Sequence, residues 1–144
     1  MKNYSRDITI IIVTFQSTSR VIDFIKKIPK IFRIIIVDNS KDISLLKKFK
    51  KYKNIKIYFH KNDGFGTSLN FAVNKIKTDY FFQISPDLKF NFNQLKLIYR
   101  EGKKLKNNFS ALGPRFINAN KKGHIQSNIN EEVGNVEAVH GSAI

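Results

Sequence analysis

Two short runs of β-branched apolar residues constrain the fold of this chain more than any other feature. Residues 8–14 read ITIIIVT and residues 33–37 read RIIIV. Short apolar runs with almost no polar alternation are typical of strands that are covered on both faces, as in a parallel sheet. Parallel strands need long crossover connections, which are usually helices. The two runs therefore predict an α/β fold.

The pattern of strand followed by helix continues along the chain. The first predicted helix begins at Ser17 or Thr18, either of which can cap it, and Pro29 closes it. Further strands are predicted over residues 55–59, 80–84 and 111–116, and further helices over residues 43–49, 67–76 and 93–106. Residues 118–123 read as a polar turn and residues 135–144 as a strand that leads into a loop or helix. This alternation predicts a mainly parallel sheet with right-handed crossovers and helices on its faces.

The chain is strongly basic, with 26 basic residues against 11 acidic ones and a formal charge of +15. Such an excess favours phosphate-bearing partners, acidic lipid surfaces or nucleic acid. Only five of the basic residues are arginines, and the chain is also rich in Ile, Asn and Phe, which share A/T-rich codons with Lys. A biased base composition gives lysine-rich solvated faces without a binding role, and this interpretation ranks above a dedicated nucleic-acid surface.

Cysteine is absent from the sequence, so neither a disulfide framework nor a thiolate site is available, which suits a reducing cytoplasm. The apolar run after the charged first seven residues is too short for a signal peptide and lacks a small-residue cleavage site. No run approaches the ~20 apolar residues that cross a bilayer. We expect a cytoplasmic chain that is soluble or at most peripheral to a membrane.

Polar turns follow three of the predicted strands: residues 14–16 (TFQ), 38–40 (DNS) and 85–87 (SPD). Ligands of parallel sheets bind beyond the carboxyl ends of the strands, so we expect these turns to line one rim. Each has a simpler interpretation. The turn at Thr14 alone is more typical of an ordinary strand end or helix cap, and Asp38 is equally typical of an Asx turn and of a ligand acceptor.

A glycine-containing loop, residues 62–66 (NDGFG), precedes the third predicted helix, and Asn70 follows one turn into it. The free N–H groups at a helix N-terminus favour an anion such as diphosphate. The spacing matches neither the Gly-x-Gly-x-x-Gly of dinucleotide folds nor a phosphate-binding loop. A binding loop and a plain turn are therefore equally consistent with this segment.

Asp87 ends the turn at residues 85–87, where Pro86 stiffens the backbone and aims the carboxylate outward. Mg²⁺ commonly takes one or two carboxylates plus substrate phosphate oxygens, so Asp87 suffices for a metal if a diphosphate supplies the rest. A turn or helix-capping aspartate is the alternative. The three histidines, His60, His124 and His140, have no metal-ligand spacing.

Four of these segments, in this order, resemble family 2 glycosyltransferases, in particular the rhamnosyltransferase-like branch. The matching segments are residues 10–16 (IIIVTFQ), 36–40 (IVDNS), 62–66 with Asn70, and 85–87. The region from residues 113–115 (GPR) to 140–142 (HGS) fits less specifically. The resemblance implies a GT-A (nucleotide-diphospho-sugar transferase) fold, a mostly parallel sheet flanked by helices. It also implies that residues 1–144 form a single donor-binding domain that is incomplete at its C-terminus.

The function that the resemblance implies is inverting transfer of a sugar from a UDP- or dTDP-sugar to a glycan or lipid-linked acceptor, in cell-surface polysaccharide synthesis at the inner face of the membrane. Mg²⁺ or Mn²⁺ held by Asp87 would stabilise the leaving diphosphate. Thr14 and Asp38 would contact the base, and Ser85 stands where many members carry the first Asp of an Asp-x-Asp motif. The general base is expected beyond Ile144. The implied donor-site residues are Thr14, Phe15, Gln16, Asp38, Asn39, Asn62, Gly64, Phe65, Gly66, Asn70, Ser85 and Asp87.

Two other functions fit the sequence. The first is a basic, non-catalytic module for RNA or anionic lipid, whose binding would fall steeply with salt and would not depend on Asp87 or metal. Its nucleic-acid form ranks low because Phe65, Phe81, Phe82 and Phe90 sit on apolar strands and tight turns, as core or pocket residues do. The second is an inactive, truncated remnant that binds nothing.

Overall fold

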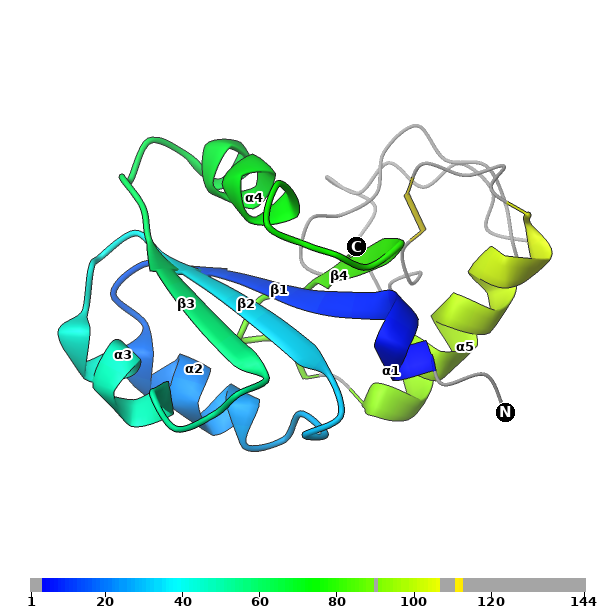
Figure 1. Cartoon of the computed structure of the whole chain (residues 1–144), viewed down its shortest axis with the longest axis horizontal. Coiled ribbons are helices and arrows are strands. Elements are labelled where there is room, and N and C mark those ends of the chain that lie inside the picture. The colour runs from blue at the N-terminus through cyan, green and yellow to red at the C-terminus, as the bar shows by residue number, and fades with distance from the viewer. Residues whose placement is uncertain (1–3, 90, 107–110, 113–144) are drawn as a thin grey trace, which may run out of the picture.

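The structure is a computed structural model that describes residues 4–89, 91–106 and 111–112. Strands and helices alternate along these residues after a short initial helix (Figure 1). In chain order they are α1 (Tyr4–Asp7), β1 (Ile8–Thr14), α2 (Thr18–Ile25), β2 (Arg33–Asp38), α3 (Ile43–Phe49), β3 (Ile55–Phe59), α4 (Phe65–Val73), β4 (Tyr80–Gln83) and α5 (Phe92–Lys104).

The four strands form one parallel sheet in the order β3-β2-β1-β4. The chain builds β1, β2 and β3 outward in one direction and then crosses back to place β4 on the other side of β1. The strand order therefore reverses between β1 and β4, and open α/β sheets bind ligands in the crevice at such a reversal. The predicted parallel sheet flanked by helices is confirmed.

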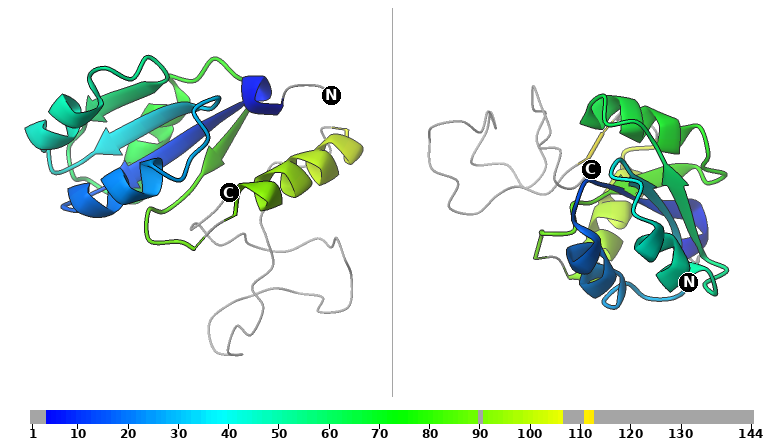
Figure 2. Two further views of the ribbon diagram at one scale, coloured as in Figure 1. Left: turned by 90° about the horizontal axis from the view of Figure 1, so that it is seen from below. Right: turned by 90° about the vertical axis from the view of Figure 1, so that its left-hand side faces the viewer.

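Helices cover both faces of the sheet. Figure 1 and the right panel of Figure 2 show α4 on one face and α2 and α3 on the other. Because successive side chains of a strand point to opposite faces, each β-branched run fills two cores at once. This is why β1 and β2 read as continuous apolar sequences. The larger core includes Ile10, Ile12, Ile34, Ile36, Val21, Phe24, Leu45, Phe82 and Leu95, and the smaller one under α4 includes Ile11, Ile35, Val37 and Ala72.

Most predicted elements are confirmed, with shifted ends. The first helix stops at Ile25 rather than running to Pro29, and Ile28 is buried from the turn that follows. The helix predicted from Thr67 is α4, which begins at Phe65, because Gly64 takes a φ of +116° and ends the loop two residues early. The short α1 was not predicted. Of the predicted strand 111–116 only the first two residues are described, and they are not in a strand; the segments 118–123 and 135–144 lie outside the described residues.

The helix predicted over residues 43–49 is present as α3, but only part of its apolar set is inward. Leu45 and Phe49 are buried, whereas Ile43 is 59% exposed and Leu46 is 42% exposed. A helix of seven residues at the margin of a layer has one covered side, so two of its four apolar side chains remain in solvent. None of the helices in the described ranges combines the length and apolarity needed to span a bilayer.

A central core position should be far more sensitive than an exposed one of the same type. Ile36 of β2 has no exposed surface, so Ile36→Ala should lower the free energy of unfolding by about 3 kcal/mol through lost burial and a cavity. Ile43→Ala removes the same atoms from an exposed site and should change it by less than about 0.5 kcal/mol. Urea denaturation of the two variants measures this difference. Equal losses would contradict the packing described here.

Candidate functional site

The turns after β1 and β2 meet directly at the carboxyl edge of the sheet. Thr14 and Asp38 are register partners at the ends of their strands, and the Asn39 N–H donates to the Thr14 carbonyl at 2.9 Å. The His60 N–H, just after β3, donates to the Asp38 carbonyl at 3.2 Å. Ser85 follows β4 on the opposite side of β1. The parallel sheet thus brings the predicted polar turns to one rim.

Asp38 is the central residue of this rim, and its carboxylate is almost fully buried. One oxygen accepts hydrogen bonds from the backbone N–H of Ser40 at 2.9 Å and from its hydroxyl, and the other accepts from the Asp42 N–H at 2.7 Å. Asp38 therefore forms the Asx turn that was one of its two predicted roles. Since an ionised carboxylate has about four acceptor positions, these bonds do not exhaust it. Its contact with a ligand stays a prediction.

Asp42, rather than Asp38, caps the next helix. Its carboxylate accepts from the Ser44 N–H at 2.8 Å and from the Thr18 hydroxyl at 2.5 Å, which joins the start of α3 to the start of α2. The pKa of the Asp42 carboxyl lies below its ordinary value. The hydrogen bond from Thr18 is the main cause, and the hydrogen bonds from Ser44 come next. Ser17 occupies the cap position of α2 but donates to the Phe15 carbonyl instead, so the predicted side-chain cap is wrong.

Thr14 has a buried hydroxyl with no hydrogen-bond partner among the described residues. A buried polar group without a partner costs about 1–3 kcal/mol, so such groups call for an explanation, and a bound ligand is one. The next two residues, Phe15 and Gln16, are exposed, and Gln16 has a φ of 49°, which is uncommon outside glycine. The end of β1 therefore combines an unsatisfied hydroxyl with an accessible, strained turn.

The glycine-containing loop leads into the N-terminus of α4, as predicted. Residues 61–67 are exposed, and Phe65 and Gly66 belong to the first helical turn rather than to the loop. A Cβ added at Gly66 would meet nothing within 4 Å, so the space above this turn is open. Asn62 and Asn70 are exposed as well. The backbone N–H groups of this first turn are the ones that an α-helix leaves without intrahelical partners.

A buried contact ties the start of α4 to the rim. The Ser68 hydroxyl donates to the Asn39 side-chain oxygen at 2.9 Å, and both residues are buried. Ser68 was not identified from the sequence, where a serine inside an amphipathic helix gives no signal of a buried partner far along the chain. Asn39 also donates its N–H to the Thr14 carbonyl at the end of β1. This one residue therefore holds both the end of β1 and the start of α4 in place.

His60 lies beside Ser68 and Asp63, but the three do not form a catalytic triad. The His60 Nδ1 is 3.5 Å from the Ser68 hydroxyl and 3.7 Å from an Asp63 carboxylate oxygen, and 3.0 Å from the Lys61 carbonyl. A triad histidine uses opposite ring nitrogens for serine and aspartate, whereas here one nitrogen faces all three groups. The ring also packs against Phe71 at 4.8 Å. This arrangement is that of a packing histidine.

Asp87 is exposed on the turn after β4, where the Leu88 N–H donates to the Ser85 carbonyl at 3.1 Å. No hydrogen bond or ion pair joins its side chain to another residue of the described part. Nowhere in that part do three or more His, Cys, Asp or Glu side chains gather to hold a metal. One available carboxylate at the rim fits a hard divalent cation whose other ligands are diphosphate and water oxygens.

Gln83, two residues before Ser85, is fully buried, and neither its amide oxygen nor its amide nitrogen has a partner within the residues described. It lies beside Ile11 in the sheet register and, with Phe81, points to the α4 face. The sequence interpretation did not single it out, although a glutamine inside the run YFFQI was an available signal. We assign it no role in binding.

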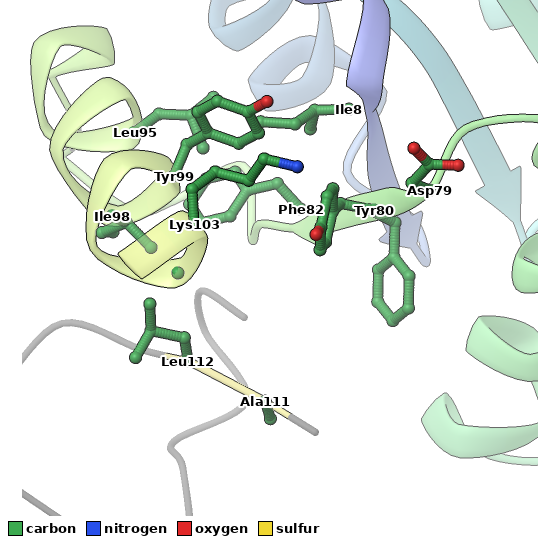
Figure 3. A pocket seen from close by; sticks show the side chains of 12 residues that line it. Ile8, Asp79, Tyr80, Phe82, Leu95, Ile98, Tyr99, Lys103, Ala111 and Leu112 are labelled. Carbon is green, nitrogen blue, oxygen red and sulfur yellow. The ribbon is translucent and has the colours of Figure 1, made fainter. Parts of the chain in front are cut away.

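A cavity of about 160 Å³ lies between β4 and α5, away from the rim (Figure 3). Ile8 and Tyr80, which line it, begin their strands, so it opens at the amino ends of the sheet. Burial and a hydrogen bond to Asp7 raise the pKa of Tyr99, another lining residue, to about 12. Lys103 lies over the rings of Tyr80 and Tyr99 at 5.2 and 5.8 Å. The cavity is mostly apolar and shares no residue with the polar turns.

The fold and the rim define a class of protein: a parallel α/β domain whose polar turns gather at the carboxyl edge, at the point where strand order reverses. The model of the family "Glycosyl transferase family 2" matches residues 9–137. The chain belongs to this family, and its four-stranded parallel sheet flanked by helices is consistent with the GT-A fold. The matched range contains every predicted donor-site residue. No curated protein matches the chain.

The two glycines of the loop should respond oppositely to alanine. Gly64 combines a φ of +116° with a ψ of 152°, a region open essentially to glycine alone, so Gly64→Ala should lower the free energy of unfolding by about 2 kcal/mol. Gly66 is helical with open space above it, so Gly66→Ala should raise it by about 0.5 kcal/mol. Urea denaturation checks both signs. Equal destabilisation by the two variants would contradict the loop conformation.

Proposed function

We propose that this glycosyltransferase binds a nucleoside-diphosphate sugar at the carboxyl edge of its sheet, within one donor-binding domain over residues 1–144. The supporting observation is the juxtaposition of Asp38 with the Thr14 hydroxyl, which has no partner among the described residues, one strand away from the turn that carries Asp87. A hydroxyl that is buried, unsatisfied and placed beside a strand-order reversal is explained by a polar ligand that completes it.

In this proposal the base and the diphosphate of the donor meet different segments of the rim. The base lies at the turns after β1 and β2, against Thr14, Phe15, Gln16, Asp38 and Asn39. The diphosphate lies between the first turn of α4 and the turn after β4. The free N–H groups of α4 and its partial positive charge favour an anion there. Asn62, Gly64, Phe65, Gly66, Asn70 and Ser85 shape this part of the site.

Asp87 would hold the metal, Mg²⁺ or Mn²⁺, with the diphosphate supplying further oxygen ligands. Bound there, the cation supplies charge that stabilises the departing nucleoside diphosphate. The residues of the chain position the groups that would bind the donor. Asn39 and Ser68 hold the start of α4 against the end of β1, and Pro86 stiffens the turn that carries Asp87. The outcome is direct displacement at the anomeric carbon with inversion. A base must deprotonate the acceptor hydroxyl, and we assign that role to no described carboxylate.

From the resemblance of its sequence segments we further propose the substrates. The protein is a hexosyl- or rhamnosyltransferase that uses a UDP- or dTDP-sugar. It extends a glycan or lipid-linked acceptor of a cell-surface polysaccharide, at the cytoplasmic face of the membrane. The family match gives no support to a non-catalytic RNA or lipid module. The sugar and the acceptor are set by pocket shape rather than by the fold.

Asp87 and Asp79 give a matched test, because both are exposed aspartates and they flank opposite ends of β4. Saturating Mg²⁺ with UDP or dTDP should raise the melting temperature by roughly 5–10 °C. Asp87→Asn should abolish the metal-dependent part of this shift, and Asp79→Asn should keep it. Differential scanning fluorimetry with and without EDTA measures both. The proposal fails if no nucleoside diphosphate produces a shift, or if Asp87→Asn keeps the whole of it.

Thr14→Val separates ligand binding from stability. Removing a buried hydroxyl that has no described partner should raise the free energy of unfolding by about 1 kcal/mol, while a lost hydrogen bond to the nucleotide should weaken its binding about fivefold. The matched control is Thr9→Val, whose hydroxyl is bonded to that of Thr78 at 2.8 Å, at the other end of the strand. It should destabilise the protein and leave affinity unchanged. Urea denaturation and calorimetric titration with UDP and dTDP report the two effects, and unchanged affinity in Thr14→Val would remove this hydroxyl from the site.

A further inference from the structure

The segment from α3 to the start of β3 is the most lysine-rich surface of the chain. Residues 41–56 hold 7 of its 21 lysines, all of them exposed, and a single acidic residue. That residue is Asp42, which is occupied in capping α3 and binding Thr18. The ion pairs found among the described residues lie elsewhere and include none of these lysines. The seven are Lys41, Lys47, Lys48, Lys50, Lys51, Lys53 and Lys56.

The same surface exposes apolar side chains. Ile43, Leu46, Lys47 and Lys50 follow one another at spacings of three, one and three residues, so they lie along one side of α3. We call these four residues the α3 stripe. Leu45 and Phe49 fill the core on the opposite side of the helix. The outward stripe is therefore apolar at its first turn and basic at its last, and exposed Tyr52 follows it.

The α3 stripe lies on the outside of the molecule. Figure 1 shows α3 at one end of the helix layer, and the left panel of Figure 2 places α2 between α3 and α5. The neighbouring strand β3 is at the edge of the sheet. The stripe is consequently open to a large, flat partner rather than to a small molecule.

An anionic lipid surface fits this combination best. Lysines attract such a surface at about 1 kcal/mol each, and exposed apolar side chains enter the boundary between headgroups and acyl chains. RNA would use the lysines but would leave Ile43 and Leu46 without a role, and Tyr52 beside the stripe packs its ring against Phe49 instead of extending a platform for stacked bases. A biased base composition accounts for how many lysines the chain has, but not for their concentration around exposed apolar residues.

We propose that the α3 stripe docks this glycosyltransferase on an anionic membrane surface. The α3 stripe is independent of the donor site, since none of its four residues belongs to that site. The geometry is compatible with both, because α3 begins just after the Asp38 turn and runs back toward the amino ends of the strands.

The charge part is tested by co-sedimentation of the full chain with vesicles. Vesicles of phosphatidylcholine mixed with phosphatidylglycerol should bind the protein, with affinity that falls as salt is raised, and pure phosphatidylcholine vesicles should not. Lys47→Glu/Lys50→Glu should weaken binding at least about 30-fold, at roughly fivefold per lysine lost. Lys77→Glu/Lys96→Glu makes the same change in net charge at exposed sites elsewhere and should weaken it far less. Equal weakening by both pairs would show attraction by net charge alone and would overturn the proposal.

The apolar part has its own matched pair. Leu46 is 42% exposed on the stripe and Leu97 is 49% exposed on α5. Of these two leucines only Leu46 enters the lipid in the proposal. Leu46→Ser should therefore weaken vesicle binding about fivefold, and Leu97→Ser should leave it unchanged. A different result would overturn the proposal: vesicle binding weakened by the Lys47/Lys50 pair but not by Leu46→Ser, together with binding of single-stranded RNA by the wild-type chain. That result would assign the surface to nucleic acid. Circular dichroism melting, and the nucleotide-induced thermal shift if wild type gives one, should be unchanged in the Lys47/Lys50 pair, which keeps a docking defect distinct from failure of the donor site.

Discussion

The buried carboxylate of Asp38 is the constraint on which the rest of this architecture depends. By accepting hydrogen bonds from Ser40 and Asp42 it folds the chain sharply at the end of β2. That turn places Asp42 to cap α3 and to bind α2 through Thr18. It also aims Asn39 back at β1 and at Ser68 of α4. One short polar segment therefore joins elements from both faces of the sheet, at the edge where a ligand would bind.

In the proposed site, stability and ligand binding compete for the same groups at this edge. A carboxylate that is buried and multiply hydrogen-bonded is rigid, which suits a base-binding residue, but each bond to its own turn uses an acceptor position that a ligand would want. Thr14 is the complementary case, since its hydroxyl is placed at the same edge and has no partner in the described structure. The rim thus pairs a satisfied anchor with an unsatisfied neighbour. Such local departures from full satisfaction are expected at functional sites.

Charge is also distributed unevenly over the molecule. The carboxyl edge of the sheet gathers polar side chains and the N-terminal N–H groups of α4, while 7 of the 21 lysines lie exposed over residues 41–56. In the proposed arrangement, this separation keeps the membrane contact and the donor site on different segments of the chain. A basic surface and a diphosphate site need not overlap, although the high net charge of the chain made them hard to separate in sequence.

The sequence by itself indicated strands β1 to β4 and the parallel sheet that they form, most clearly β1 and β2, because β-branched runs covered on both faces leave a strong local pattern. It also indicated the family, through segments whose spacing is set by the fold. It did not determine which alternative Asp38 takes, that Asn39 and Ser68 would meet across 29 residues, or that Ile43 and Leu46 would face solvent. Those were decided by tertiary structure, because burial and long-range hydrogen bonds depend on which elements become neighbours, and no local pattern of residue types records that.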